Sequence, residues 1–167
     1  MELPRVTNAA GTRSFALFPA AVLAFIFDSQ GRLLLLRKPG RSGAWEVVSG
    51  GLEAGETVKE GLLREVHEEL GDAVQLKVMG VLHAGSFQYD AVISLISISW
   101  LLEYMGGPIV AGDDAAGAEV RWWTREALLR DAPAVRVPRE PWLLERAFAL
   151  RPLVLDLSME LESSSEH

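Results

Sequence analysis

Three glutamates in a short acidic run, Glu65, Glu68 and Glu69, have the spacing needed to act together. At positions i, i+3 and i+4 of a helix, their side chains project from one arc of its surface. Like charges at such spacings weaken a helix unless a cation offsets them. Mg²⁺ and Mn²⁺ suit this role, because hard divalent ions take oxygen ligands and are often shared between carboxylates and substrate phosphates. The spacing therefore allows two interpretations, a divalent-metal site and a solvated acidic helix face.

The segment 57–70 is predicted to be the helix that carries these carboxylates. Thr57 and Glu60 have the spacing of a capping box, and Gly71 follows where a glycine commonly ends a helix. Apolar residues form a stripe beside the acidic arc: Val58, Leu62, Leu63, Val66 and Leu70. This stripe should dock on a sheet and leave the glutamates at the edge of the junction, where they can border a cleft.

A glycine turn precedes the predicted helix and completes a longer pattern. The chain reads Gly50, five other residues, Glu56, seven others, and then Arg64-Glu65-Val66-His67-Glu68-Glu69-Leu70-Gly71. This arrangement resembles the Nudix box of the Nudix hydrolase family, here from Gly50 to Asp72. An arbitrary acidic arc is most often a solvated helix face. The glycine turn and Glu56 favour a metal site instead, although Asp72 stands where an aliphatic residue usually closes the box.

The resemblance implies a role for each residue of the box. The implied metal ligands are Gly50, through its carbonyl, and Glu65, Glu68 and Glu69. Glu56 corresponds to an outer carboxylate that supports the site, and Arg64 to an arginine that orients the carboxylates by ion pairing. The implied cofactor is Mg²⁺ or Mn²⁺. The implied reaction is hydrolysis of a phosphoanhydride bond by a metal-activated water, in a nucleoside diphosphate linked to a further group.

The general base of this reaction is left open. Glu69 and Glu65 are the candidates within the box. Asp113, Asp114 and Glu119 are additional candidates, because they precede or begin a predicted strand and could approach the metal from across the cleft.

Substrate recognition is expected outside the box. Arg37, Lys38 and Arg41 lie upstream and are candidates to contact terminal phosphates, while Phe87 and Tyr89 could stack on a base. Surface charge and loop packing remain the alternative interpretations of these two groups.

The substrate class can be ranked but not fixed. ADP-ribose or another nucleoside diphosphate sugar comes first, and removal of pyrophosphate from nucleoside triphosphates, including oxidised ones, comes second. The alternative from a different class is a non-catalytic, nucleotide-sensing Nudix-like module. The intact glutamates argue against it.

The order of predicted elements indicates an α/β (α+β) fold. Strands are expected at 20–27, 32–37, 45–48, 74–82, 91–104 and 119–123, and further helices at 125–130 and 142–151. This order, together with the Nudix resemblance, predicts a mixed β-sheet sandwiched between helices. We expect a single Nudix domain over 1–159 and a disordered tail over 160–167.

Composition limits the partners and the location. The net charge of −7 disfavours binding to long nucleic acids, so a small nucleotide is the expected ligand. With no cysteine and no apolar run long enough to span a bilayer, we expect no membrane partner and a cytoplasmic location. Similar proteins are often dimeric, which favours a homodimer.

Overall fold

The computed structural model describes residues 5–40, 43–88, 94–131, 135–138 and 140–164. The strands are β1 (Arg5–Thr7), β2 (Ser14–Ala16), β3 (Ala20–Phe27), β4 (Leu33–Arg37), β5 (Trp45–Glu46), β6 (Val48–Gly51), β7 (Gln75–Gln88), β8 (Ser94–Gly106), β9 (Glu119–Trp123) and β10 (Val135–Val137). The helices are α1 (Val58–Leu70), α2 (Arg125–Asp131) and α3 (Pro141–Ser164), with a 3₁₀ turn at Asp113–Ala115. Strands β3 to β10 form one mixed sheet of eight strands.

Strand β3 lies at the centre of this sheet. It runs parallel to β8 along its whole length and antiparallel to β6 and β4 at its two ends. Alternate side chains of β3 enter different apolar clusters, Val22 on one face and Leu23 on the other, for example. Both faces are covered, which explains why the strand is almost continuously apolar. Burial of each such side chain stabilises the fold by about 1.5–3 kcal/mol.

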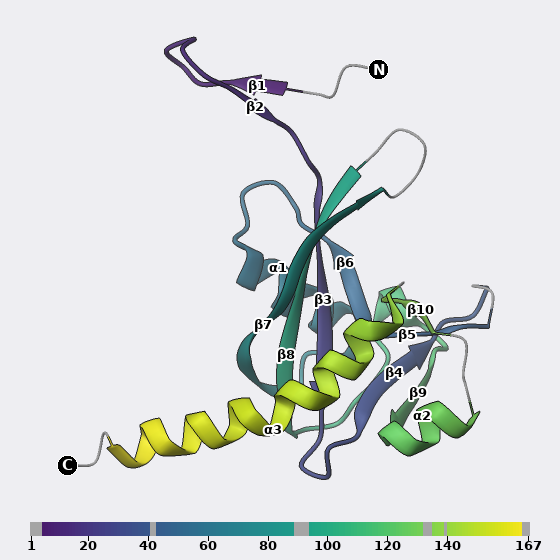
Figure 1. Ribbon diagram of the computed structural model, residues 1–167. Coiled ribbons are helices and arrows are strands. Elements are labelled where there is room, and N and C mark those ends of the chain that lie inside the picture. The colour runs from purple at the N-terminus through teal and green to yellow at the C-terminus, as the bar shows by residue number, and fades with distance from the viewer. Residues whose placement is uncertain (1–4, 41–42, 89–93, 132–134, 139, 165–167) are drawn as a thin grey trace.

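The two faces of the sheet are covered by different helices. Leu62, Val66 and Leu70 of α1 join the first cluster, whereas Leu143 and Ala147 of α3 join the second. In Figure 1, α3 crosses one face of the sheet and α1 lies on the other. The predicted mixed sheet between helices is therefore confirmed.

Several elements differ from the sequence-based expectation. The segment 45–48 forms two strands, because β5 pairs with β4 whereas β6 pairs with β3. Helix α3 continues past Pro152 to Ser164, and so enters the segment 160–167 for which we expected disorder. Strands β1, β2 and β10 were not expected, since each has three residues and is too short to show a period.

The β1–β2 hairpin projects from the body of the protein (Figure 1). Its two strands pair with each other in a separate two-stranded sheet, and their residues are exposed.

Among the described residues, no helix has both the length and the apolar character needed to cross a membrane.

Candidate functional site

Helix α1 has the ends that the sequence predicts. The Thr57 hydroxyl accepts a hydrogen bond from the Glu60 N–H at 3.3 Å, and the Glu60 carboxylate accepts one from the Thr57 N–H at 2.7 Å. At the other end, the Gly71 N–H donates to the His67 carbonyl at 2.8 Å, with Gly71 at a φ of 90° that favours glycine. An N-cap of this kind contributes about 1 kcal/mol. The capped helix is a fixed support for the box glutamates.

Arg64 ties three carboxylates together. Its guanidinium donates to both oxygens of Glu56, at 2.9 and 3.1 Å. It also donates to Glu65 at 3.0 Å, to Glu68 at 2.9 Å and to the Gly51 carbonyl at 2.8 Å. The hydrogen bond from Arg64 is the main reason that the pKa of Glu56 is lowered. These contacts are what a side chain that orients carboxylates should make, and the catalytic roles stay predictions.

Gly50 and Glu65 lie against each other. A Cβ at position 50 would stand 1.9 Å from the Glu65 Cδ and 2.0 Å from both carboxylate oxygens, so only glycine fits beside this side chain. Glu65 is 8% exposed, and burial raises its pKa while Arg64 acts in the opposite direction. Close approach to the backbone thus explains the glycine of the turn.

Glu69 is the most buried carboxylate of the box, at 1% exposure. Its Oε1 accepts from the Lys38 Nζ at 2.8 Å and from the Ser49 N–H at 3.5 Å. Its Oε2 is buried and has no hydrogen-bond partner among the described residues. Burial raises the pKa of Glu69 to about 7, although the Lys38 ammonium works to lower it.

The donor set fits a hard divalent ion. Around Glu65 and Glu69 the atoms available to bind a metal are carboxylate oxygens, the ligand type that Mg²⁺ and Mn²⁺ prefer. The unpartnered Oε2 of Glu69 is a buried acceptor that a cation could satisfy. Within the described residues, however, no three acidic or histidine side chains already converge to hold a metal. Glu65 and Glu68 are instead held by Arg64.

The loop before β9 packs against α1. The Gly112 N–H donates to the Glu69 carbonyl at 3.3 Å, and a Cβ at Gly112 would stand 2.0 Å from the Glu68 carbonyl oxygen. Asp114 is close enough for its charge to contribute to the raised pKa of Glu65. Asp113 belongs to the same 3₁₀ turn. The requirement for glycine at position 112 escaped sequence reasoning, because it arises from a contact between distant segments.

The remaining candidates outside the box are placed as follows. Glu119 forms an exposed ion pair with Arg37, at 49% and 46% side-chain exposure. Lys38, expected to contact substrate phosphates, is buried at 8% exposure and pairs with Glu69. Arg41 and Tyr89 lie outside the described residues.

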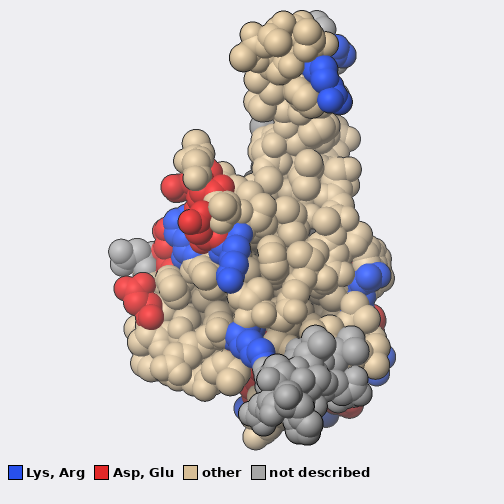
Figure 2. Space-filling model, turned by 90° about the vertical axis from the view of Figure 1, so that its left-hand side faces the viewer, with Lys and Arg blue, Asp and Glu red and all other residues tan. Residues whose placement is uncertain are grey.

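Charged side chains meet on the side of the molecule that carries α1. Figure 2 views the protein from this side and shows acidic and basic atoms interspersed in one patch, with a mostly uncharged surface around it. The ion pairs of Arg64 partly neutralise Glu56, Glu65 and Glu68.

A cavity of about 600 Å³ borders the glycine turn. The residues Ser49, Gly50 and Gly51 form part of its lining. Phe87 is also in the wall, and its role in stacking on a base stays a prediction.

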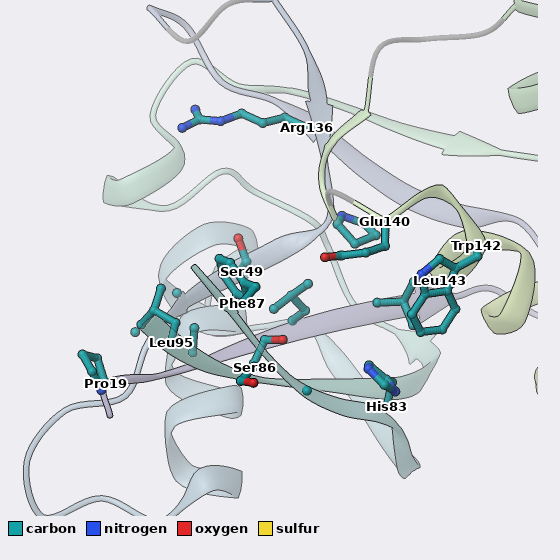
Figure 3. A pocket seen from close by; sticks show the side chains of 17 residues that line it. Pro19, Ser49, His83, Ser86, Phe87, Leu95, Arg136, Glu140, Trp142 and Leu143 are labelled. Carbon is teal, nitrogen blue, oxygen red and sulfur yellow. The ribbon is translucent and has the colours of Figure 1, made fainter. Parts of the chain in front are cut away.

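The far part of the cavity was not foreseen from the sequence. His83 and Trp142 are in edge-to-face contact there, with ring centroids 5.0 Å apart. In Figure 3, Glu140, Trp142 and Leu143 form one wall, and His83 lies beneath Trp142. These residues come from β7, from the start of α3 and from the position just before α3, and no local pattern links the two segments.

Comparisons with known proteins identify the family of the chain. Residues 17–143 match the family model described as the NUDIX domain. The chain is 35% identical over 106 residues to an ADP-ribose pyrophosphatase of Methanocaldococcus jannaschii, covering 62% of each protein. It is 32% identical over 124 residues to an NAD-capped RNA hydrolase NudC of Vibrio vulnificus, covering 74% of this chain and 44% of the relative. The matches thus span less than two thirds of either relative's length.

A solved structure shows the same fold. The crystal structure of a UDP-X diphosphatase superposes with a TM-score of 0.67 at 19% identity, covering 84% of this chain and 66% of that one. The family model spans most of the sheet and the whole box, including the carboxylates held by Arg64 and Lys38. The chain therefore belongs to the Nudix family.

Proposed function

We propose that this protein is a metal-dependent hydrolase that cleaves the diphosphate linkage of a nucleoside diphosphate derivative, with ADP-ribose or another nucleoside diphosphate sugar as substrate. The observation that carries this proposal is the placement of the box carboxylates. Glu65 is pressed against Gly50, which lines the cavity of about 600 Å³, and Glu69 has one buried oxygen without a partner. The name of the archaeal relative, an ADP-ribose pyrophosphatase, supports the choice of substrate.

The proposed metal is Mg²⁺ or Mn²⁺, held by Glu65, Glu68 and Glu69 with the Gly50 carbonyl. When bound, such an ion supplies positive charge to the diphosphate oxygens and acidity to a water molecule. Arg64 keeps two of the ligands in place through its bonds to Glu65 and Glu68. Glu69 is held instead by Lys38 and by the Ser49 N–H.

The reaction adds water across the diphosphate. Water attacks one phosphorus, the bridging P–O bond breaks, and two phosphate monoesters are released. Oε2 of Glu69 faces the proposed metal, so the water proton is assigned to Glu65, whose pKa burial raises, with Asp113, Asp114 and Glu119 as the other candidates.

The cavity would hold the part of the substrate beyond the diphosphate. Its volume of about 600 Å³ lies within the usual range for small-molecule sites. Phe87 and Trp142 offer aromatic surface for a base, and Glu140 and His83 offer hydrogen-bonding groups for hydroxyls or amines. The homodimer and the cytoplasmic location expected from the sequence stay predictions.

The test is a substrate panel with purified protein and Mg²⁺ or Mn²⁺. ADP-ribose, other nucleoside diphosphate sugars, nucleoside triphosphates with an oxidised member, and dinucleoside polyphosphates are incubated, and products are separated by chromatography. We expect ADP-ribose or another sugar derivative to give the highest kcat/KM. The Glu69→Gln variant should lower it by about 10²–10⁴-fold, because it weakens the metal site and a metal ion supplies several kcal/mol to the transition state.

The matched control is Glu145→Gln, which removes an exposed carboxylate paired with Arg125 and should keep full turnover. If a nucleoside triphosphate is the preferred substrate, the proposed substrate class is wrong but the proposed hydrolase activity stands. Tight nucleotide binding without turnover of any substrate would overturn the proposed enzymatic activity and favour a nucleotide-sensing module.

A further inference from the structure

Lys38 is a buried cation that contacts Glu69 of helix α1. It directly follows β4, where the preceding residue, Arg37, is exposed, whereas Lys38 itself is 8% exposed. Its Nζ lies 2.8 Å from Oε1 of Glu69 and 3.8 Å from Oε1 of Glu46. Glu69 and Glu46 are also buried, at 1% and 2% exposure. The ammonium therefore faces two carboxylates in the interior.

Stability alone is a weak explanation for such a cluster. Buried ions lose their hydration, and apolar side chains of similar volume often replace them without loss of stability. Lysine is also among the residues least often found fully buried. A role in arranging Glu69 accounts better for the presence of Lys38.

The contacts at Glu69 divide its two oxygens between different tasks. Oε1 receives the Lys38 ammonium and the Ser49 N–H, while Oε2 receives no donor from the described residues. A carboxylate is planar, so a bond that fixes Oε1 also fixes the direction of Oε2. Lys38 thereby determines which oxygen of Glu69 is left for a further ligand.

We propose that Lys38 is a positioning residue that holds Oε1 of Glu69 and so presents Oε2 to a divalent cation. This inference rests on the proposed metal-dependent function. Two basic side chains would then hold the three glutamates of the site. Arg64, within α1, holds Glu65 and Glu68, and Lys38, after the end of β4, holds Glu69. Hydrogen bonds to ligating carboxylates of this kind orient the ligand and tune its affinity for the metal.

The experiment measures Mn²⁺ binding directly, by electron paramagnetic resonance, without substrate. Lys38→Met removes the donor while keeping most of the apolar stem, and we expect the Kd for Mn²⁺ to rise about 10–100-fold, as for loss of other outer-shell partners. Glu46→Gln is the matched control, because it alters the same buried cluster but leaves the Lys38–Glu69 bond. It should bind Mn²⁺ as the wild type does. Thermal unfolding of each variant is recorded in parallel.

A purely structural role for Lys38 predicts a different pattern. Lys38→Met would then lose stability while binding Mn²⁺ normally, or Glu46→Gln would weaken Mn²⁺ binding as much as Lys38→Met does. Either result overturns the proposal. At saturating Mn²⁺, positioning also predicts a lower kcat for Lys38→Met with an unchanged KM for the nucleotide, whereas a direct phosphate contact would raise KM.

A second variant decides the question if Lys38→Met does not fold. Lys38→Arg keeps the charge but moves the donor atoms, and the two cations are not interchangeable at a fixed contact. Positioning predicts an intermediate weakening of Mn²⁺ binding, and an unchanged Kd would overturn it. If the wild-type protein itself neither binds Mn²⁺ nor hydrolyses any nucleotide, the proposed function fails instead.

Discussion

The carboxylates around the box are divided between two ion-pair clusters. The arginine cluster consists of Glu56, Arg64, Glu65 and Glu68, and the lysine cluster of Lys38, Glu46 and Glu69. In the arginine cluster, Arg64 and Glu68 keep 24% and 39% of their side chains exposed. In the lysine cluster, no side chain is more than 8% exposed. Similar pairs of charges therefore lie in very different surroundings.

The difference shows that burial decides what an ion pair does to a carboxylate. In the arginine cluster, hydrogen bonding dominates at Glu56, and its pKa falls. In the lysine cluster, loss of hydration outweighs the Lys38 ammonium, and the pKa of Glu69 rises to about 7. Glu56 is therefore kept charged, whereas burial favours the protonated form of Glu69 and, within the arginine cluster, of Glu65.

Within the arginine cluster, the largest effect is expected at Gly50. Gly50→Ala places a Cβ 1.9 Å from the Glu65 Cδ, so the carboxylate must move. We expect kcat/KM to fall by about 100-fold, as for a misplacement of about 1 Å, and stability to fall by about 1–3 kcal/mol. Enzyme assays and urea unfolding measure the two effects.

The neighbouring glycine is a control for stability. A Cβ at Gly51 would meet nothing within 4 Å. Gly51→Ala should change the free energy of unfolding by less than about 0.5 kcal/mol. Equal loss of stability in both variants would show that the contact with Glu65 is not the cause.

A smaller effect is expected when the arginine cluster keeps its charge but loses its geometry. Arg64→Lys cannot maintain the two bonds to Glu56 and also reach Glu65 and Glu68, because an ammonium lacks the planar fork of donors. We expect turnover to fall by about 10–100-fold. Arg125→Lys, at an exposed pair, is the comparison. Full activity of Arg64→Lys would mean that charge alone is sufficient.

The lysine cluster should be visible in the pH dependence of stability. The pKa of Glu69 is about 7 in the folded protein against an ordinary value of 4.5, so the folded state holds the extra proton between these values. The resulting stabilisation is complete below pH 4.5 and is lost as the pH rises through 7. At 1.36 kcal/mol per pH unit, it amounts to about 3 kcal/mol.

Glu69→Gln isolates this contribution from those of other groups. Urea unfolding of the metal-free wild type and variant is compared at about pH 4 and pH 7.5, on either side of the window. The wild type should lose about 3 kcal/mol relative to the variant across this range. A constant difference would place the folded-state pKa of Glu69 near its ordinary value and would remove the contrast between the clusters.

The smallest effect is expected at Glu119, outside both clusters. Its ion pair with Arg37 is about half exposed and should contribute no more than about 1 kcal/mol. Glu119→Gln should therefore leave turnover and urea unfolding nearly unchanged. A collapse of kcat would identify Glu119 as the general base.

Local patterns in the sequence were sufficient for the box helix and for the central strand. The capping box of Thr57 and Glu60 and the end of α1 at Gly71 depend on residues within one turn of each other. Both faces of β3 are buried, so the strand is apolar along almost its whole length and can be recognised from the sequence. The strands β1, β2 and β10 were missed because three residues carry too little pattern.

The sequence by itself determined the family, the mixed fold and the arc of glutamates, because these depend on spacing along the chain. The tertiary structure alone decided how each glutamate is used. Lys38 meets Glu69 across 31 positions, and His83 meets Trp142 only after β7 and α3 pack together. Burial, and with it the raised pKa of Glu69, belongs to the packed protein, because hydration is lost only when the sheet and α1 close around the side chain.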